Sequence, residues 1–173
     1  MHFNLFRAFI VLLLLQAPFI VHAQEFTQNI RAKLSLYVEA GGNSDSYSIN
    51  IDHILYQRDA WKGGLRAGLG TNLFFMEEEP GVYPVVPLEA YAMVGKARNH
   101  FEFGLGYTKR FTDAPELLQN MYFARLGFRY QVPKGGLLVR AGLTPFISPE
   151  GRDEKTGSLA LVPRFGLSIG RSW

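Results

Sequence analysis

The last ten residues, "RFGLSIGRSW" (164–173), alternate between two kinds of side chain. Phe165, Leu167 and Ile169 are apolar, and small glycine or serine residues stand between them. A period of two residues predicts a β-strand with one apolar face. Because chain ends usually fray and carry polar residues, we expect a strand that runs on to Trp173 to be held by a partner strand.

The same alternation recurs along the chain and predicts eight strands, at residues 32–40, 46–56, 64–75, 83–95, 100–109, 121–131, 136–146 and 160–173. Each strand has the length that a tilted strand needs to cross a bilayer. Connections after the second, fourth and sixth strands are short and basic, whereas those after the third, fifth and seventh strands are longer or richer in acid; the first, "GGNSDS", is a short exception. The sequence therefore predicts an all-β fold, an eight-stranded antiparallel up-and-down transmembrane barrel with both termini at the end of the short turns.

Four prolines fall near the ends of strands that face the longer loops: Pro84, Pro87, Pro145 and Pro163. A proline inside a strand removes a hydrogen-bond donor from the ladder. We therefore expect the sheet to be bulged at these positions, or to stand above the hydrocarbon there.

The two faces of the predicted strands differ in charge. One face is apolar and carries a single fixed charge, Arg171, placed where its head can reach the interface. The other face combines arginines and carboxylates with many glycines. Arginine suits buried, forked pairing with carboxylates, and an eight-stranded barrel is just wide enough to be filled by side chains. We therefore predict a polar, side-chain-filled interior with an ion-pair network of Lys33, Glu39, Asp52, Arg66, Glu89, Glu102, Arg125, Arg129, Arg140 and Arg164.

Aromatic residues gather at the two ends of the strands. Two aromatic girdles at the membrane interfaces are typical of such barrels. The predicted girdle near the longer loops contains Tyr47, Phe75, Tyr83, Tyr107 and Tyr122, and the other contains Trp61, Tyr130 and Trp173.

The first 23 residues have the features of a secretory signal peptide. Arg7 supplies the positive charge, residues 8–15 form an apolar core, and "VHA" offers a small-residue cleavage site. An uncleaved anchor is the alternative, but the apolar core is about half as long as a spanning helix. We predict a signal peptide at 1–23 and an outer-membrane β-barrel domain at 24–173. The chain has no cysteine, which excludes disulfides and thiolate metal sites.

With these patterns, the chain resembles the small eight-stranded outer-membrane barrels of Gram-negative bacteria, the OmpA-barrel and OmpX-like class. The stretches "YSINIDHILYQ", "GLRAGLG", "PLEAYAMVGKARNHFEFGLG" and "FGLSIGRSW" look most like barrel proteins of Bacteroidota. This resemblance covers residues 31–173. It implies a location in the cell outer membrane with both termini in the periplasm, and contact with outer-membrane lipid and lipopolysaccharide. It also implies a C-terminal insertion signal that the barrel-assembly machinery reads, formed by Phe165, Leu167, Ile169 and Trp173.

Few residues suggest chemistry. His53 and His100 lack the His-x-Ser pattern of a lipid A deacylase, in which a base activates the serine. His100 and Glu102 share a face but are too few for a metal site, so we predict an interior hydrogen-bonded pair. The run at 77–79 offers carboxylates for a divalent cation, although a solvated loop is the plainer interpretation. We expect no catalytic, metal-binding or cofactor-binding residues.

The leading hypothesis is a non-enzymatic integral outer-membrane barrel with a structural, envelope or surface-interaction role. Its partners would be membrane lipid and an unidentified protein that meets the outer loops. The small, mixed net charge of +3 gives no reason to expect nucleic acid. Three alternatives stay open: a narrow channel, a lipid-modifying outer-membrane enzyme, and a soluble secreted lipocalin-like carrier in which the two faces are inverted.

Overall fold

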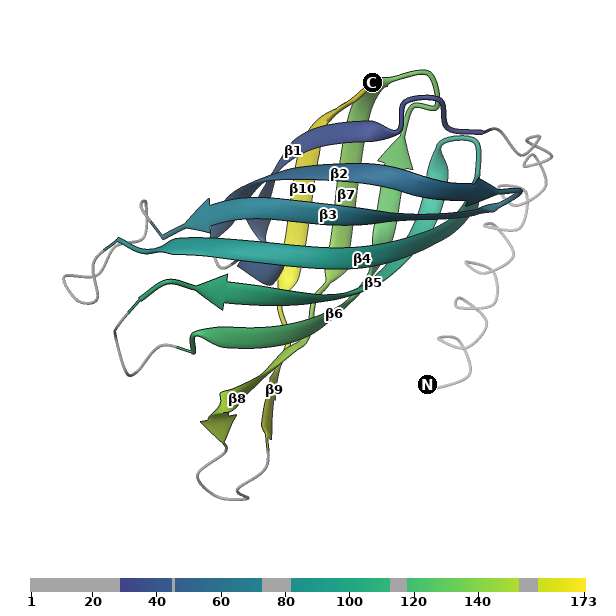
Figure 1. Ribbon diagram of the computed structural model, residues 1–173. Helices are drawn as coiled ribbons and strands as arrows, with labels where there is room; N and C mark the ends of the chain where they lie inside the picture. The colour runs from purple at the N-terminus through teal and green to yellow at the C-terminus, as the bar shows by residue number, and fades with distance from the viewer. Residues whose placement is uncertain (1–28, 45, 73–81, 113–117, 153–158) are drawn as a thin grey trace, which may run out of the picture.

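Eight antiparallel strands pair side by side, and the last pairs with the first, so that the sheet closes into a barrel (Figure 1). The computed structural model describes residues 29–44, 46–72, 82–112, 118–152 and 159–173. The barrel strands are β1 (Leu34–Gly41), β2 (Tyr47–Arg58), β3 (Trp61–Thr71), β4 (Pro84–Lys96), β5 (Asn99–Arg110), β6 (Asn120–Gln131), β7 (Gly136–Leu143) and β10 (Phe165–Ser172). The predicted all-β, eight-stranded antiparallel barrel is confirmed.

Closure depends on the strand that ends the sequence. Strand β10 pairs with β1 from Ser35 opposite Ser172 to Gly41 opposite Gly166, and with β7 on its other edge. Beyond β10, the backbone groups of Trp173 and Leu34 exchange hydrogen bonds of 2.9 and 3.2 Å. The terminal strand is therefore held on both sides, as its alternation predicts.

The two ends of the barrel differ. One end, here called the turn end, carries short turns at 59–60, 97–98 and 132–135 together with Trp173. Asp59 and Ala97 open the two-residue turns with φ of 51° and 50°. The opposite end, here called the loop end, carries the first connection, in which a 3-10 helix, η2 (Gly42–Ser44), is buried. The first turn is shorter than the sequence predicts because β2 and β3 extend to Arg58 and Trp61.

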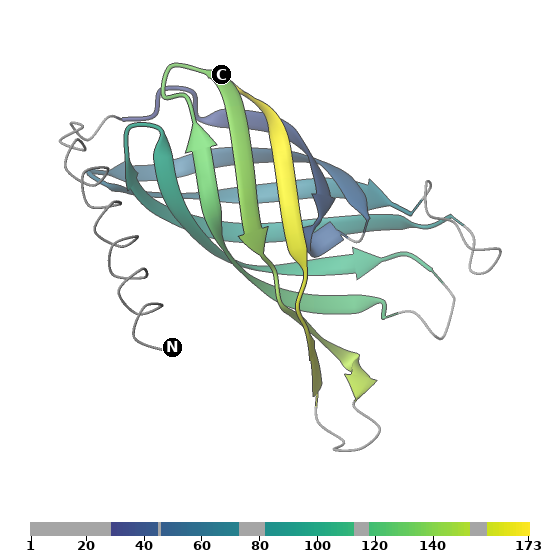
Figure 2. The same cartoon turned by 180° about the vertical axis from the view of Figure 1, so that it is seen from behind.

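The strand predicted at 160–173 divides in two at a proline, and the strand predicted at 136–146 ends before a proline and is followed by a further strand. Strand β7 ends at Leu143, and after Pro145 the chain continues as β8 (Phe146–Arg152). Strand β8 pairs with β6 and with β9 (Leu159–Val162), which is separated from β10 by Pro163. Figures 1 and 2 show the β8–β9 hairpin projecting from the loop end. The expected disturbance at Pro145 and Pro163 is confirmed.

The other two prolines lie in β4. Pro84 is the first residue of this strand, where no ladder is interrupted. Pairing between β3 and β4 lapses at Pro87, between the pairs Ala67–Leu88 and Gly70–Val85. A different irregularity, a register shift in β2 between Ile54 and Tyr56, was not predicted.

Side chains cover the interior at both ends. At the turn end, Ile30 packs with Ile54, Tyr91 and Met93 in a buried apolar cluster. The segment before β1 is fixed there because the N–H groups of residues 31 and 32 both donate to the carbonyl of Pro133. At the loop end a second cluster is formed by Met121, Phe123 and Phe146. No helix among the described residues is long and apolar enough to span a membrane.

Three predictions fall outside the described residues. These are the signal peptide at 1–23, the carboxylates at 77–79 and the girdle residue Phe75.

Interior glycines make room for the charged side chains, and Gly104 provides a test. A Cβ atom at Gly104 would collide with the buried carboxylate of Glu89. We expect Gly104→Val to lower the free energy of unfolding by about 1–3 kcal/mol through overpacking. Urea unfolding in detergent measures this change. Ala124→Val is the matched control, since Ala124 belongs to the outward-facing set of β6, and it should change stability far less. Equal effects of the two variants would contradict the assigned faces.

Candidate functional site

The interior of the barrel is filled with charged side chains. Arg125, Arg129 and Arg140 are the three largest fully buried side chains among the described residues. Because an isolated buried charge is very costly, each arginine must be neutralised by nearby carboxylates.

Nearest the loop end, two arginines and two glutamates form a closed ring in which positive and negative charges alternate. Arg66 contacts Glu39 at 3.1 Å and Glu89 at 2.9 Å. Arg125 contacts the same two carboxylates, Glu39 at 2.9 Å and Glu89 at 3.2 Å. Both arginines are therefore shared between both acids, and the ring bears no net charge.

Toward the turn end, a second group forms a chain. Arg129 makes a forked pair with Asp52, in which both nitrogen–oxygen distances are 3.0 Å, and approaches Glu102 at 3.4 Å. Arg140 pairs with Glu102 and lies 3.9 Å from Glu89, which joins the chain to the ring. Four arginines and four carboxylates thus make one continuous, neutral network.

Two buried tyrosines and several neutral groups complete the network. The guanidinium groups of Arg66 and Arg140 lie 5.5 and 4.9 Å from the centre of the Tyr37 ring, a cation–π arrangement. Tyr91 lies under Arg129 in the same way and donates a 3.2 Å hydrogen bond to Asp52. Such contacts add to the ion pairs in a low-dielectric interior, where an unpaired polar group is costly.

Every barrel strand supplies part of the network. In strand order the contributing residues are Glu39, Asp52, Arg66, Glu89, Glu102, Arg125, Arg140 and, from β10, Ser168, whose hydroxyl donates to Glu39 over 2.8 Å. The network therefore joins all eight strands across the lumen, in addition to the ladders between neighbours.

Eight of the ten residues predicted for the interior network are in it, and two are placed differently. Lys33 lies just before β1 with its side chain exposed to solvent, so its assignment to the interior was wrong. The alternation does not continue beyond the start of the strand. Arg164 lies between β9 and β10 with its guanidinium 4.7 Å from the Phe146 ring. It sits at the loop end, apart from the ring and chain.

Sequence reasoning missed several interior polar residues. Asn50 accepts two hydrogen bonds from Arg66, at 2.8 and 3.1 Å, and Gln131 accepts one from Arg129 at 2.8 Å. Lys62 is also buried, and its ammonium group makes two weak contacts of 3.4 Å to the backbone carbonyls of Ala60 and Gly95. Lys62 was missed because the predicted strand began at residue 64. Once β3 begins at Trp61, alternation places Lys62 on the same face as Arg66.

The expected hydrogen-bonded pair of His100 and Glu102 does not form. Both residues are buried on the inner face, but neither ring nitrogen of His100 bonds to the Glu102 carboxylate. The Glu102 carboxylate instead forms ion pairs with Arg129 and Arg140. Within the described part of the chain, no group of three or more histidine, aspartate or glutamate side chains could hold a metal ion.

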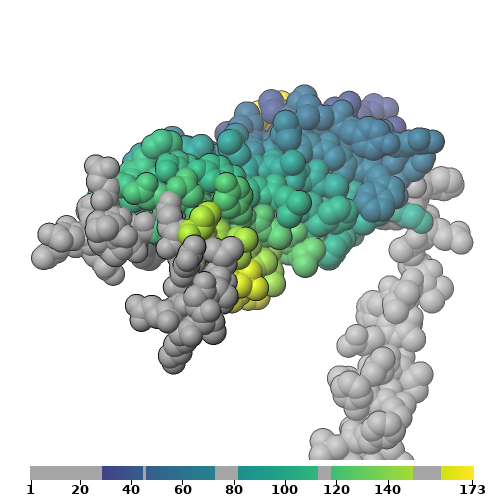
Figure 3. All heavy atoms as spheres, turned by 60° about the horizontal axis from the view of Figure 1, so that its bottom comes forward, coloured from purple at the N-terminus to yellow at the C-terminus, as the bar shows by residue number. Residues whose placement is uncertain are grey.

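The outer face of the barrel is a continuous apolar belt. Figure 3 shows side chains packed over part of the outer surface of the barrel. Each of the eight strands contributes large apolar side chains that are about half exposed or more. They are Leu36, Val38, Ile49, Ile51, Leu55, Leu65, Leu69, Leu88, Phe101, Leu105, Leu126, Phe128, Leu137, Phe165, Leu167 and Ile169. The predicted division into an apolar outer and a charged inner face is thus observed.

Aromatic residues border this belt. At the loop end the rings of Tyr107 and Tyr122 are 5.3 Å apart, and at the turn end Trp61 and Trp173 are exposed. Tyr83 is buried instead of exposed, so its assignment to a girdle was wrong. Tyr83 shares the inward face with the buried Val85 and Glu89, and its backbone N–H donates to the Asn72 side chain over 3.0 Å.

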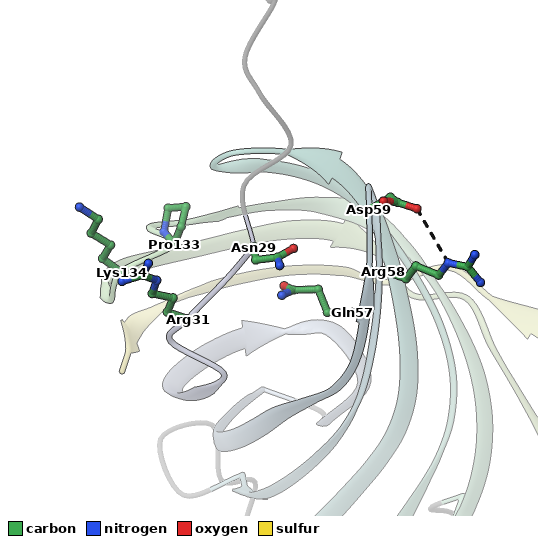
Figure 4. A pocket seen from close by; sticks show the side chains of 7 residues that line it. All are labelled: Asn29, Arg31, Gln57, Arg58, Asp59, Pro133 and Lys134. Carbon is green, nitrogen blue, oxygen red and sulfur yellow. Dashed lines mark ion pairs between the residues drawn. The ribbon is translucent and has the colours of Figure 1, made fainter.

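A polar pocket of about 590 Å³ lies at the turn end, lined by Asn29, Arg31, Gln57, Arg58, Asp59, Pro133 and Lys134 (Figure 4). It is separate from the interior network.

No protein-family model matches the chain, and the comparisons with curated proteins and with solved structures also found no match.

The network predicts strong coupling between Arg129 and Asp52. Arg129→Leu should lower the free energy of unfolding by about 3–5 kcal/mol, because Asp52 is left as a buried charge without its forked partner. Adding Asp52→Asn should recover part of this loss, because the uncompensated charge is removed. Urea unfolding of both single variants and the double variant measures the coupling. Strictly additive losses would contradict the pairing.

Proposed function

We propose that the protein is a non-enzymatic integral outer-membrane β-barrel with a structural, envelope or surface-interaction role. The observation that carries this proposal is the apolar belt around an interior filled by a neutral, ion-paired network. Soluble barrels have the reverse arrangement, with the apolar face inside.

The size of the belt supports a membrane environment. Fully burying one large apolar side chain is worth about 1.5–3 kcal/mol. Moving the half-exposed belt from water into hydrocarbon is therefore worth on the order of 10–25 kcal/mol. This is comparable to the whole stability of an ordinary domain, about 5–15 kcal/mol. Hydrocarbon around the belt would remove the free-energy cost of exposing these side chains to water.

The ends of the barrel suggest its orientation. Short turns face the periplasm and longer loops face outward in bacterial barrels of this kind. The turn end would then be periplasmic, with both termini, and the loop end would meet lipopolysaccharide and any protein partner. The exposed side chains of Phe165, Leu167, Ile169 and Trp173 would serve as the insertion signal for the barrel-assembly machinery. Export would use the signal peptide predicted at 1–23.

The other candidate functions have less support. A channel needs an open lumen, whereas the described interior is occupied by the network and covered by apolar clusters at its two ends. A lipocalin-like carrier needs an apolar interior. For lipid-modifying chemistry, His53 and His100 face opposite sides of the sheet, the first exposed and the second buried.

Extraction from membranes tests the proposal directly. After expression in a Gram-negative host, the protein should stay in the outer-membrane fraction through alkaline carbonate and be released by detergent. Release by carbonate without detergent would overturn the membrane assignment and favour the soluble carrier.

A charge placed on the belt tests the depth of insertion. Leu105, 71 % exposed, lies near the middle of β5 on the outer face. Leu105→Arg should lower the stability in lipid by about 2–4 kcal/mol, as expected near the bilayer midplane. Tyr56→Arg, near the turn end of β2, is the matched control and should cost about 0–1 kcal/mol. Equal costs for the two variants, measured by urea unfolding from vesicles, would contradict insertion at this depth.

A further inference from the structure

Exposed positive charges gather at one end of the barrel. Among the residues whose side chains the structure describes, every exposed lysine and arginine lies at the turn end: Arg31, Lys33, Arg58, Lys96, Arg98, Lys134 and Arg171. We call these seven residues the basic rim. Within the same part of the chain one carboxylate side chain is exposed, that of Asp59, and it also lies at the turn end. The turn end therefore carries a large excess of positive charge that the interior network does not need.

The basic rim surrounds the barrel. Arg31 and Lys33 precede β1, Arg58 ends β2, and Lys134 lies in the turn after β6. The remaining three lie at the β4–β5 turn and on β10. Because these elements are spread around the closed sheet, the charges form a ring instead of a single patch.

The rim cations are weakly engaged by the protein itself. Arg58 lies 3.9 Å from Asp59, and both side chains are largely exposed. Arg98 donates a long hydrogen bond of 3.4 Å to the hydroxyl of Tyr130. The interior arginines, by contrast, each hold two or more carboxylates. The rim cations are therefore available to an external anion.

The view into the polar pocket shows where two of these cations, Arg58 and Lys134, point. Asn29 and Gln57 face each other near its centre, whereas Arg58 and Lys134 extend away from it on opposite sides (Figure 4). A single anion bound over the lumen would require the cations to converge. Their directions favour anions arranged around the perimeter of the barrel.

The perimeter is also where the apolar belt ends. Arg171 follows Ile169 on the outer face of β10, and Trp61 and Trp173 are exposed at the same level. Lipid that covers the belt would bring its headgroups to the basic rim. We propose that the basic rim binds the phosphate groups of anionic phospholipids in the leaflet around the turn end. This inference rests on the proposed membrane function and goes beyond it in selecting the lipid.

Tryptophan fluorescence offers the test, because the chain has two tryptophans and both lie at the turn end. The protein is refolded in vesicles of equal amounts of phosphatidylglycerol and phosphatidylcholine, with brominated acyl chains on one lipid or the other. In about 0.1 M salt, the brominated anionic lipid should quench about twofold more strongly. In 1 M salt the difference should shrink, since the Debye length falls from about 10 to about 3 Å.

A triple variant, Lys33→Gln with Lys96→Gln and Lys134→Gln, should reduce the preference for the anionic lipid. Lys109→Gln is the matched control, since Lys109 lies at the loop end and bonds to Asn120 over 3.1 Å, and it should preserve the preference. Equal quenching by both lipids in low salt would overturn the inference while leaving membrane insertion intact. Absence of quenching by either lipid would instead overturn the proposed function.

Discussion

Buried arginines and carboxylates neutralise one another inside this barrel, and the rest of the structure depends on that balance. Removing ions from water costs several kcal/mol for each ion even after relaxation. The cost is offset because each arginine of the network meets two or more carboxylates and because tyrosine, asparagine and serine groups add further hydrogen bonds. A network of this kind occupies the middle of the lumen, so most large apolar side chains face outward and the buried ones gather in clusters toward the two ends.

The same network constrains the register of the sheet. Side chains alternate between the two faces, so a slip by one residue would move the charges of that strand to the outer face. Glu39 on β1 must meet Arg66 on β3 and Arg125 on β6 at the same time. Strands β1 and β10, which close the barrel, are tied together through Ser168 as well as by their ladder. The interior ion pairs and the closure of the barrel therefore require the same strand register.

Much of this arrangement could be predicted from alternation alone. A period of two residues assigns each side chain to a face, and the absence of carboxylates from one face identifies the charged face as the interior. Pairing partners could not be predicted, because which carboxylate meets Arg129 depends on stagger between strands far apart in sequence. Lys33 was misplaced because alternation loses its meaning where a strand begins. Tyr83 follows the alternation of the buried Val85 and Glu89, and it was misplaced because its position at the strand end was taken without its face. The β8–β9 hairpin was missed because Pro145 and Pro163 redirect strands whose sequence pattern continues through them.

The charges at the turn end of the barrel differ from those of the interior. In the interior network four arginines are matched by four carboxylates; at the turn end, cations are exposed and in excess. An outer belt that ends at a basic rim is consistent with a barrel whose solvent is lipid along its length and anionic headgroup at one end.

The most direct test of the account is a nitroxide scan of β6. Since the chain has no cysteine, single cysteines can be placed and labelled at each position from 122 to 130. After refolding in vesicles, collision with oxygen should rise and fall with a period of two. The account predicts maxima at the even-numbered positions, which include Leu126 and Phe128, and minima at the odd-numbered positions, which include Arg125 and Arg129. Maxima at the odd-numbered positions, or no periodicity, would contradict it.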